Sequence, residues 1–111
     1  MDTRHPRREV SIETRLFLPS ANPKILPCRI VNVSKGGVKV QIFVNYLLPS
    51  RLIIMRAEHE NMYECRTAWQ VGQTAGLAFV SLCARAKHQE VIEEMKTARI
   101  INRNDPSLHL N

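Results

Sequence analysis

Two short segments of this chain contain the side chains best suited to binding an anionic ligand. The first is Arg4-His5-Pro6-Arg7-Arg8, which places three guanidinium groups within five residues. A guanidinium is planar and permanently charged, so it forks onto a phosphate or a guanine edge and stacks on a base. The same composition is also typical of an exposed basic terminus, and we expect residues 1–9 to form a flexible arm.

The second segment is Asn32-Val33-Ser34-Lys35-Gly36-Gly37, which joins two predicted strands. Asn and Ser offer short hydrogen-bonding side chains at a fixed place. The two glycines permit positive φ and let a ligand approach the backbone closely. These residue types are equally ordinary in a hairpin turn, so the segment alone does not decide between a turn and a binding site.

The net charge of the 111-residue chain is +6, and the positive charge is unevenly distributed. Residues 1–56 contain ten Lys or Arg and three Asp or Glu, whereas residues 57–111 contain six and seven. The length fits one domain, and 44% apolar residues suffice for a core. The basic first half indicates an anionic partner, which is a nucleotide, a nucleic acid or an anionic lipid headgroup.

Several classes of protein are excluded by what the sequence lacks. No run approaches 18 apolar residues, so we expect no membrane insertion, and the charged N-terminus has no apolar stretch typical of a signal peptide. The cysteines are three, far apart, and form no C-x-x-C pair. Scattered thiols at apolar positions favour buried free cysteines and a cytoplasmic protein over a disulfide framework or a zinc site.

No group of residues has the spacing of a catalytic or metal centre. The four histidines are dispersed and none follows the zincin pattern. Ser34 lacks the preceding glycine of a nucleophile elbow, and Glu90, Glu93 and Glu94 fall on the polar face of a predicted helix. We therefore predict a binding module and not an enzyme, with no catalytic residue, no metal and no cofactor.

Apolar periodicity predicts the elements that position the two segments. Alternation predicts six strands, near residues 10–18, 25–33, 38–44, 52–55, 63–71 and 75–79. Phe17 falls outside the alternation, and Pro27 suggests an edge or a bulge. Gly72-Gln73 predicts a tight hairpin, and a period of three to four predicts a helix over 84–99.

Short strands followed by a single helix predict the fold class. No long helix separates the strands, so a parallel α/β sheet is excluded and a small barrel or sandwich is favoured. We expect the helix to cover an open end or a face, which gives a domain over 10–101 and a mobile tail over 102–111. Trp69 is expected to pack in the core or at the barrel rim, and the less favoured alternative is that it borders a ligand.

The two segments, in this order, resemble the PilZ domain family. Arg4 and Arg8 match its Arg-x-x-x-Arg element, and Asn32, Ser34 and Gly37 match its [Asp/Asn]-x-Ser-x-x-Gly element. The strand that leads into the turn and the later hairpin are also similar to those of the family. The resemblance extends over about residues 4–80, and it implies an all-β fold, a six-stranded antiparallel β-barrel with a C-terminal α-helix.

The resemblance also implies a ligand, the bacterial second messenger cyclic di-GMP. The arginine arm would contact its phosphates and a guanine, while the turn would hold a guanine against the barrel. The implied ligand-binding residues are Arg4, Arg7, Arg8, Asn32, Ser34, Gly36 and Gly37. Two registers of the arginine motif remain. In the first, Arg4 and Arg8 form the motif. In the second, Arg7 is the second arginine, because it fits the alternation of the first strand better than Arg8, and the position four residues before it is then Thr3 instead of an arginine.

These observations favour a cyclic di-GMP receptor that orders its arm on the ligand and signals to a protein effector, in motility or biofilm regulation. The alternative is an adaptor on the same fold that binds a protein without nucleotide. A nucleic-acid partner is disfavoured, because aromatic residues amount to 5% and no predicted strand has paired exposed aromatics for base stacking.

Overall fold

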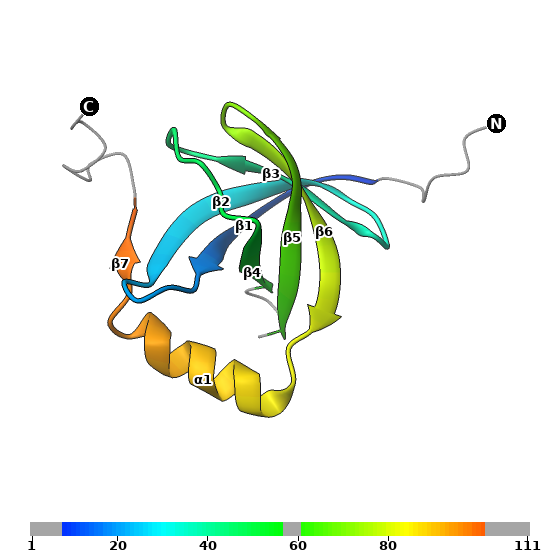
Figure 1. The fold of residues 1–111 in the computed structure, drawn as a ribbon. Coiled ribbons are helices and arrows are strands. Elements are labelled where there is room, and N and C mark those ends of the chain that lie inside the picture. Colours follow the sequence, from blue (N-terminus) through cyan, green and yellow to red (C-terminus); the bar gives the residue numbers. More distant parts are fainter. Residues whose placement is uncertain (1–7, 57–60, 102–111) are drawn as a thin grey trace.

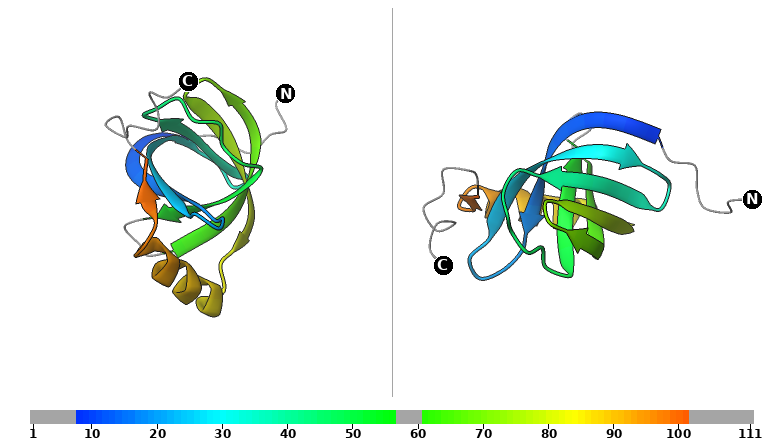
Figure 2. Two further views of the ribbon diagram at one scale, coloured as in Figure 1. Left: turned by 60° about the vertical axis from the view of Figure 1, so that its left-hand side comes forward. Right: turned by 90° about the horizontal axis from the view of Figure 1, so that it is seen from above.

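Six strands close into an antiparallel barrel in the computed structural model, which describes residues 8–56 and 61–101. The barrel order is β1-β4-β5-β6-β3-β2, and pairing of β1 with β2 closes it, as Figures 1 and 2 show. This confirms the predicted six-stranded barrel with a helix after it. The strands are β1 (Arg8–Leu18), β2 (Lys24–Val33), β3 (Gly37–Ile42), β4 (Arg51–Arg56), β5 (Asn61–Val71) and β6 (Thr74–Leu82).

The predicted alternation fills the barrel interior with apolar side chains. Val38, Val40 and Ile42 of β3 are buried in one cluster, while Lys39 and Gln41 between them face outward. Leu16, Leu26 and further inward residues of the other strands belong to the same cluster. Because successive residues of a strand point to opposite faces, the outward positions of each strand remain available for other contacts.

Helix α1 (Arg85–Met95) lies outside the barrel, next to β1, β4 and β5, as Figure 2 shows. Its Val91 is fully buried against Phe17, Ile53 and Met62, which are outward residues of these strands. This contact explains why Phe17 departs from the alternation of β1. The helix is short and has no side-chain N-cap, so packing of this apolar face is its main stabilisation.

The predicted end of the helix was wrong, because the chain after Met95 forms a further strand. Strand β7 (Arg99–Ile100) pairs in parallel with Lys24 and Ile25 of β2. The last residue of β3 that pairs with β2 is Ile42, which is opposite Cys28. Lys24 and Ile25 therefore have no partner from β3, and β7 pairs with that edge of β2. The next residue, Ile101, is buried in the barrel core.

Two smaller departures concern β1 and β2. β1 begins at Arg8, two residues earlier than predicted, because Arg8 and Glu9 pair with Val33 and Asn32. Along β2, Pro27 lies between the residues that pair with β3 and those that pair with β7, so that edge of β2 is unpaired at Pro27. The bulge between β2 and β3 falls elsewhere, between Ile30 and Asn32. The predicted arm over 1–9 and the tail over 102–111 lie otherwise outside the described residues.

The thiols of Cys28 and Cys65 are free and fully buried in the core, as predicted. Burial disfavours the thiolate, which raises the pKa of each thiol to about 12. Cys83, at the end of β6, is partly exposed, and partial burial also raises its pKa.

Ionisation of the buried thiols makes the stability of the barrel fall in alkaline solution. The unfolded thiols ionise near pH 9 while the folded ones stay protonated, so unfolding becomes easier as the pH rises above that value. The slope that each thiol contributes is about half of 1.4 kcal/mol per pH unit at pH 9 and approaches about 1.4 kcal/mol per pH unit only above pH 10. Urea unfolding between pH 8 and pH 10 measures it. Cys65→Ala is expected to flatten the slope and Ser81→Ala to leave it unchanged, and equal slopes in all three proteins contradict the assignment.

Candidate functional site

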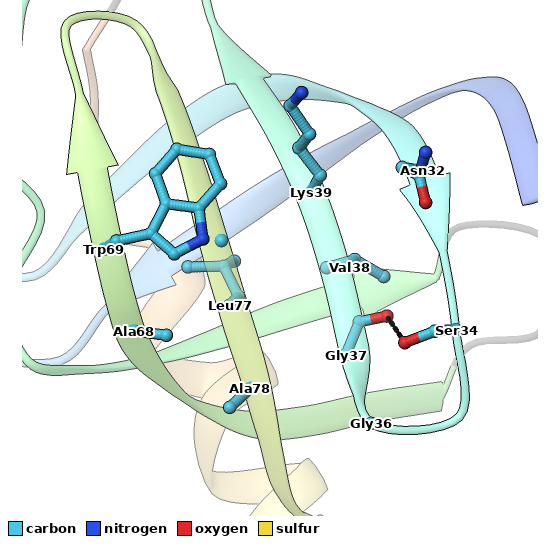
Figure 3. A pocket seen from close by; sticks show the side chains of 11 residues that line it. Asn32, Ser34, Gly36, Gly37, Val38, Lys39, Ala68, Trp69, Leu77 and Ala78 are labelled. Carbon is cyan, nitrogen blue, oxygen red and sulfur yellow. Dashed lines mark hydrogen bonds between the residues drawn. The ribbon is translucent and has the colours of Figure 1, made fainter. Parts of the chain in front are cut away.

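A shallow pocket of about 170 Å³ lies on the outer face of the barrel, over the strands β2, β3, β6 and β5. We call it the outer pocket. It brings together the four predicted turn residues, Asn32, Ser34, Gly36 and Gly37, and adds Lys39 and Trp69 among its lining (Figure 3). An apolar cavity of about 150 Å³ holds benzene, so this volume is on the scale of one planar ring system.

The floor of the outer pocket is made of small residues because of the strand register. Gly37 pairs with Ala78, and Gly76 pairs with both Lys39 and Trp69. A Cβ at Gly37 would overlap the carbonyl oxygen of Leu77, so β3 and β6 approach too closely for any other residue. A Cβ at Gly76 would overlap the indole of Trp69, with Cε2 at 2.6 Å.

The reason expected for the turn glycines was wrong in one respect. Among the described residues, the glycine with positive φ is Gly72 (φ 59°), in the β5–β6 hairpin, and neither Gly36 nor Gly37 adopts that conformation. Close packing, and not left-handed backbone, therefore explains Gly37. The hairpin at Gly72-Gln73 itself is confirmed.

The loop between β2 and β3 is held by backbone hydrogen bonds, and its Ser34 side chain lines the outer pocket. The Ser34 amide donates to the Gly37 carbonyl at 3.0 Å, and the Phe79 amide donates to the Gly36 carbonyl at 2.9 Å. The Ser34 hydroxyl is 3.5 Å from the Gly37 carbonyl, at the limit of a hydrogen bond. The Asn32 side chain has no hydrogen bond with any residue that the structure describes. Both groups can therefore bind a ligand.

Trp69 lines the outer pocket from the outer face of β5, so the expectation that it packs in the core was wrong. A bulge in β5 between Thr67 and Trp69 allows the consecutive residues Ala68 and Trp69 both to line the pocket. The Trp69 side chain is 41% exposed, so part of the indole surface is accessible from the pocket. The next residue, Gln70, fixes this end of β5 by donating to the Tyr46 carbonyl at 2.7 Å and accepting from the Leu48 amide at 2.9 Å.

Of the three candidate arginines, the structure describes Arg8 alone, and Arg4 and Arg7 lie outside the described residues. Arg8 is exposed at the start of β1 and pairs with Val33, next to Ser34 in the chain. Directly opposite residues project from the same face of a sheet. Arg8 is therefore on the same face as Val33, and Glu9 is on the same face as Asn32. β1 therefore begins beside the turn, with Glu9 directly opposite Asn32.

Lys39, Gly76 and Ala78 belong to the outer pocket but were not predicted as site residues. The signal in the sequence is positional, because the alternation places Lys39 at an outward position of β3 and the small residues Gly76 and Ala78 at outward positions of β6. Lys39 is half-buried and lies between Asn32 and Gly76 in the strand register. Its ammonium is the cation that the structure places at the pocket wall (Figure 3).

Neither metal nor membrane features occur in the described part of the chain. No three His, Cys, Asp or Glu side chains in residues 8–56 and 61–101 gather as a metal site would require. No helix in these ranges is long and apolar enough to cross a membrane.

Comparison of the chain with known proteins found no match to a protein-family model and no significant match to a curated protein. The function of the protein is therefore inferred from its sequence motifs and from the residues of the outer pocket.

Gly76→Ala tests the contact between the floor of the pocket and the indole. The added methyl must displace the ring of Trp69, so we expect a shift of the emission maximum and a changed accessibility to acrylamide quenching. Trp69 is the single tryptophan of the chain, so intrinsic fluorescence reports on this pocket directly.

The matched control is Gly72→Ala, where a Cβ meets nothing within 4 Å but the backbone has φ 59°. It is expected to lower stability by about 1–3 kcal/mol and to leave the folded emission spectrum unchanged. An unchanged spectrum for Gly76→Ala would show that the indole does not lie over Gly76.

Proposed function

We propose that this protein is a PilZ-type receptor for cyclic di-GMP, a binding module and not an enzyme. The observation that supports it best is the shared location of Asn32, Ser34, Gly36, Gly37 and Trp69. The same outer pocket is lined by residues identified from a sequence motif and by Trp69, which lies far along the chain from that motif. A polar turn beside an exposed aromatic ring is the combination that a purine base requires.

The outer pocket offers a separate contact for each part of a guanine nucleotide. The base stacks on the exposed part of the Trp69 indole, beside the small residues Gly37 and Ala78, and base stacking on an aromatic is worth about 1–3 kcal/mol. The Asn32 amide and the Ser34 hydroxyl hydrogen-bond the edge of the base, since both can donate and accept. The Lys39 ammonium attracts the phosphate, and the arginine arm supplies bidentate contacts to phosphate or guanine.

Binding of the ligand is converted to a signal by the arm. Residues that order on a ligand lose conformational entropy, but the surface they form exists only in the bound state. A cytoplasmic protein effector that recognises this surface provides the output, with motility or biofilm regulation as the expected process. The alternative is an adaptor that uses the same face for a protein without nucleotide.

Titration of the protein with cyclic di-GMP, followed by calorimetry and by Trp69 fluorescence, tests the proposal. We expect saturable micromolar or tighter binding with quenching of the indole, and no binding of GTP or cyclic di-AMP at the same concentration. Ser34→Ala and Asn32→Ala remove hydrogen bonds to the base and are expected to weaken binding at least tenfold. Single alanine variants of Arg4, Arg7 and Arg8 identify the register of the arginine motif.

The matched control is Ser20→Ala, which removes a serine hydroxyl from the β1–β2 turn. It is expected to keep full affinity. Absence of heat and of quenching at millimolar ligand contradicts the receptor proposal. In that case the adaptor alternative is tested by asking whether the same effector copurifies with the wild-type protein and with Ser34→Ala.

Glu9 gives an independent electrostatic test, because it is exposed and directly opposite Asn32. Its carboxylate repels an anionic ligand in the outer pocket, so Glu9→Gln is expected to tighten cyclic di-GMP binding about two- to fivefold, the range of a surface ion pair. The gain should shrink at 0.5 M salt because the charge is screened. Glu13→Gln, two pairs further along β1, is the control, and an equal gain there assigns the effect to net charge.

A further inference from the structure

The register of β4 and β5 places two arginines directly opposite one another on the outside of the barrel. Arg51 of β4 pairs with Arg66 of β5, and both side chains are exposed. Directly opposite residues have Cβ atoms about 5 Å apart, and like charges at such a pair destabilise the sheet. We call these two residues the arginine pair.

In the described part of the chain, the arginine pair has no salt bridge to an acidic residue. The nearest carboxylate along β5, that of Glu64, accepts a hydrogen bond from the Ser81 hydroxyl at 3.2 Å instead. Arg29, on the opposite side of the barrel, shows the usual arrangement, because it lies 3.8 Å from the Glu13 carboxylate and 5.7 Å from the Phe43 ring centre.

The arginine pair lies beside the floor of the outer pocket, with Arg66 on β5 and Arg51 on the next strand, β4. Ala78, which lines the pocket, pairs with Gly37 on one side and with Arg66 on the other. Adjacent strands are about 4.8 Å apart, so the backbones of Arg66 and Arg51 lie about 5 and 10 Å from that of Ala78. The row from Gly37 through Ala78 to Arg66 and Arg51 therefore runs from the polar turn to two uncompensated cations.

We propose that the arginine pair is a phosphate-binding site at the β4 side of the outer pocket. Two adjacent guanidinium groups match the oxygens of one phosphate group through bidentate hydrogen bonds, and an anion between them removes their mutual repulsion. The phosphate belongs to a nucleotide that also reaches the outer pocket, or it is a separate phosphate bound beside it. The first source rests on the proposed function, whereas the second does not.

The probe that separates the site from the nucleotide is inorganic pyrophosphate. NMR of the arginine side-chain Nε–H groups follows its titration, and saturable shifts of Arg51 and Arg66 are expected. Arg51→Gln and Arg66→Gln should each weaken pyrophosphate binding at least tenfold. Arg15→Gln, which removes an exposed arginine from β1, is the matched control and should change it less than twofold.

A second readout concerns the anion-free protein. Arg66→Gln is expected to raise the melting temperature without anion, because it removes the repulsion within the pair, and to abolish the further rise that pyrophosphate gives to the wild type. A purely structural role for Arg66 predicts the opposite sign, namely a lower melting temperature, and that result overturns the proposal.

Parallel titration with cyclic di-GMP distinguishes the sources of the phosphate. Competition between cyclic di-GMP and pyrophosphate at the arginine pair supports a phosphate of the same nucleotide, and simultaneous binding supports a separate one. Pyrophosphate binding without cyclic di-GMP binding supports the arginine pair and contradicts the proposed receptor function. Absence of pyrophosphate shifts, or an equal loss in Arg15→Gln, overturns the site while leaving the receptor function to its own test.

Discussion

The close approach of β3 and β6 at Gly37 is the constraint on which the outer face of this barrel depends. A Cβ at Gly37 would overlap the Leu77 carbonyl, so the two strands pair at this distance only because the residue has no side chain. That pairing places Ala78 beside Gly37 and Gly76 beside Lys39. It thereby produces a floor without bulky side chains, and every polar group of the outer pocket is positioned around this floor.

The outer face is used in two different ways, and the difference follows from side-chain size. Around Phe17 and Ile53 the outward residues are large and apolar, and α1 covers them through Val91. Around Gly37 and Ala78 the outward residues are small and no helix covers them, so a pocket remains there, bordered by the Trp69 indole that packs over Gly76. A bulge in β5 then adds Trp69 to this accessible region. The barrel thus separates a stabilised face from a face available for binding.

Much of this arrangement could be predicted from the sequence, because alternation and turn residues are local signals. Val38, Val40 and Ile42 identify an inward face without reference to any other strand, and the turn from Asn32 to Gly37 follows directly from its residue types. Non-local pairing could not be predicted in the same way. Nothing near Arg66 indicates that Arg51 lies opposite it, and the β7 contact that ends the helix early depends on where β3 leaves β2. The bulge beside Trp69 likewise exists only through the register with β6.

The turn also separates the outer pocket from a second cavity, and some residues line both spaces. Ser34 and Val38 line both the outer pocket and an apolar cavity of about 230 Å³ at the barrel end, between Ile12, Tyr63 and Phe79. The wall between the two is therefore a single layer of chain. The Phe79 amide holds this wall through the Gly36 carbonyl, and the Phe79 ring contacts Tyr63 with centroids 5.1 Å apart. A ligand bound to Ser34, as proposed, would contact a loop whose inner side borders an incompletely filled space, and displacement of that loop costs less there than in a close-packed core.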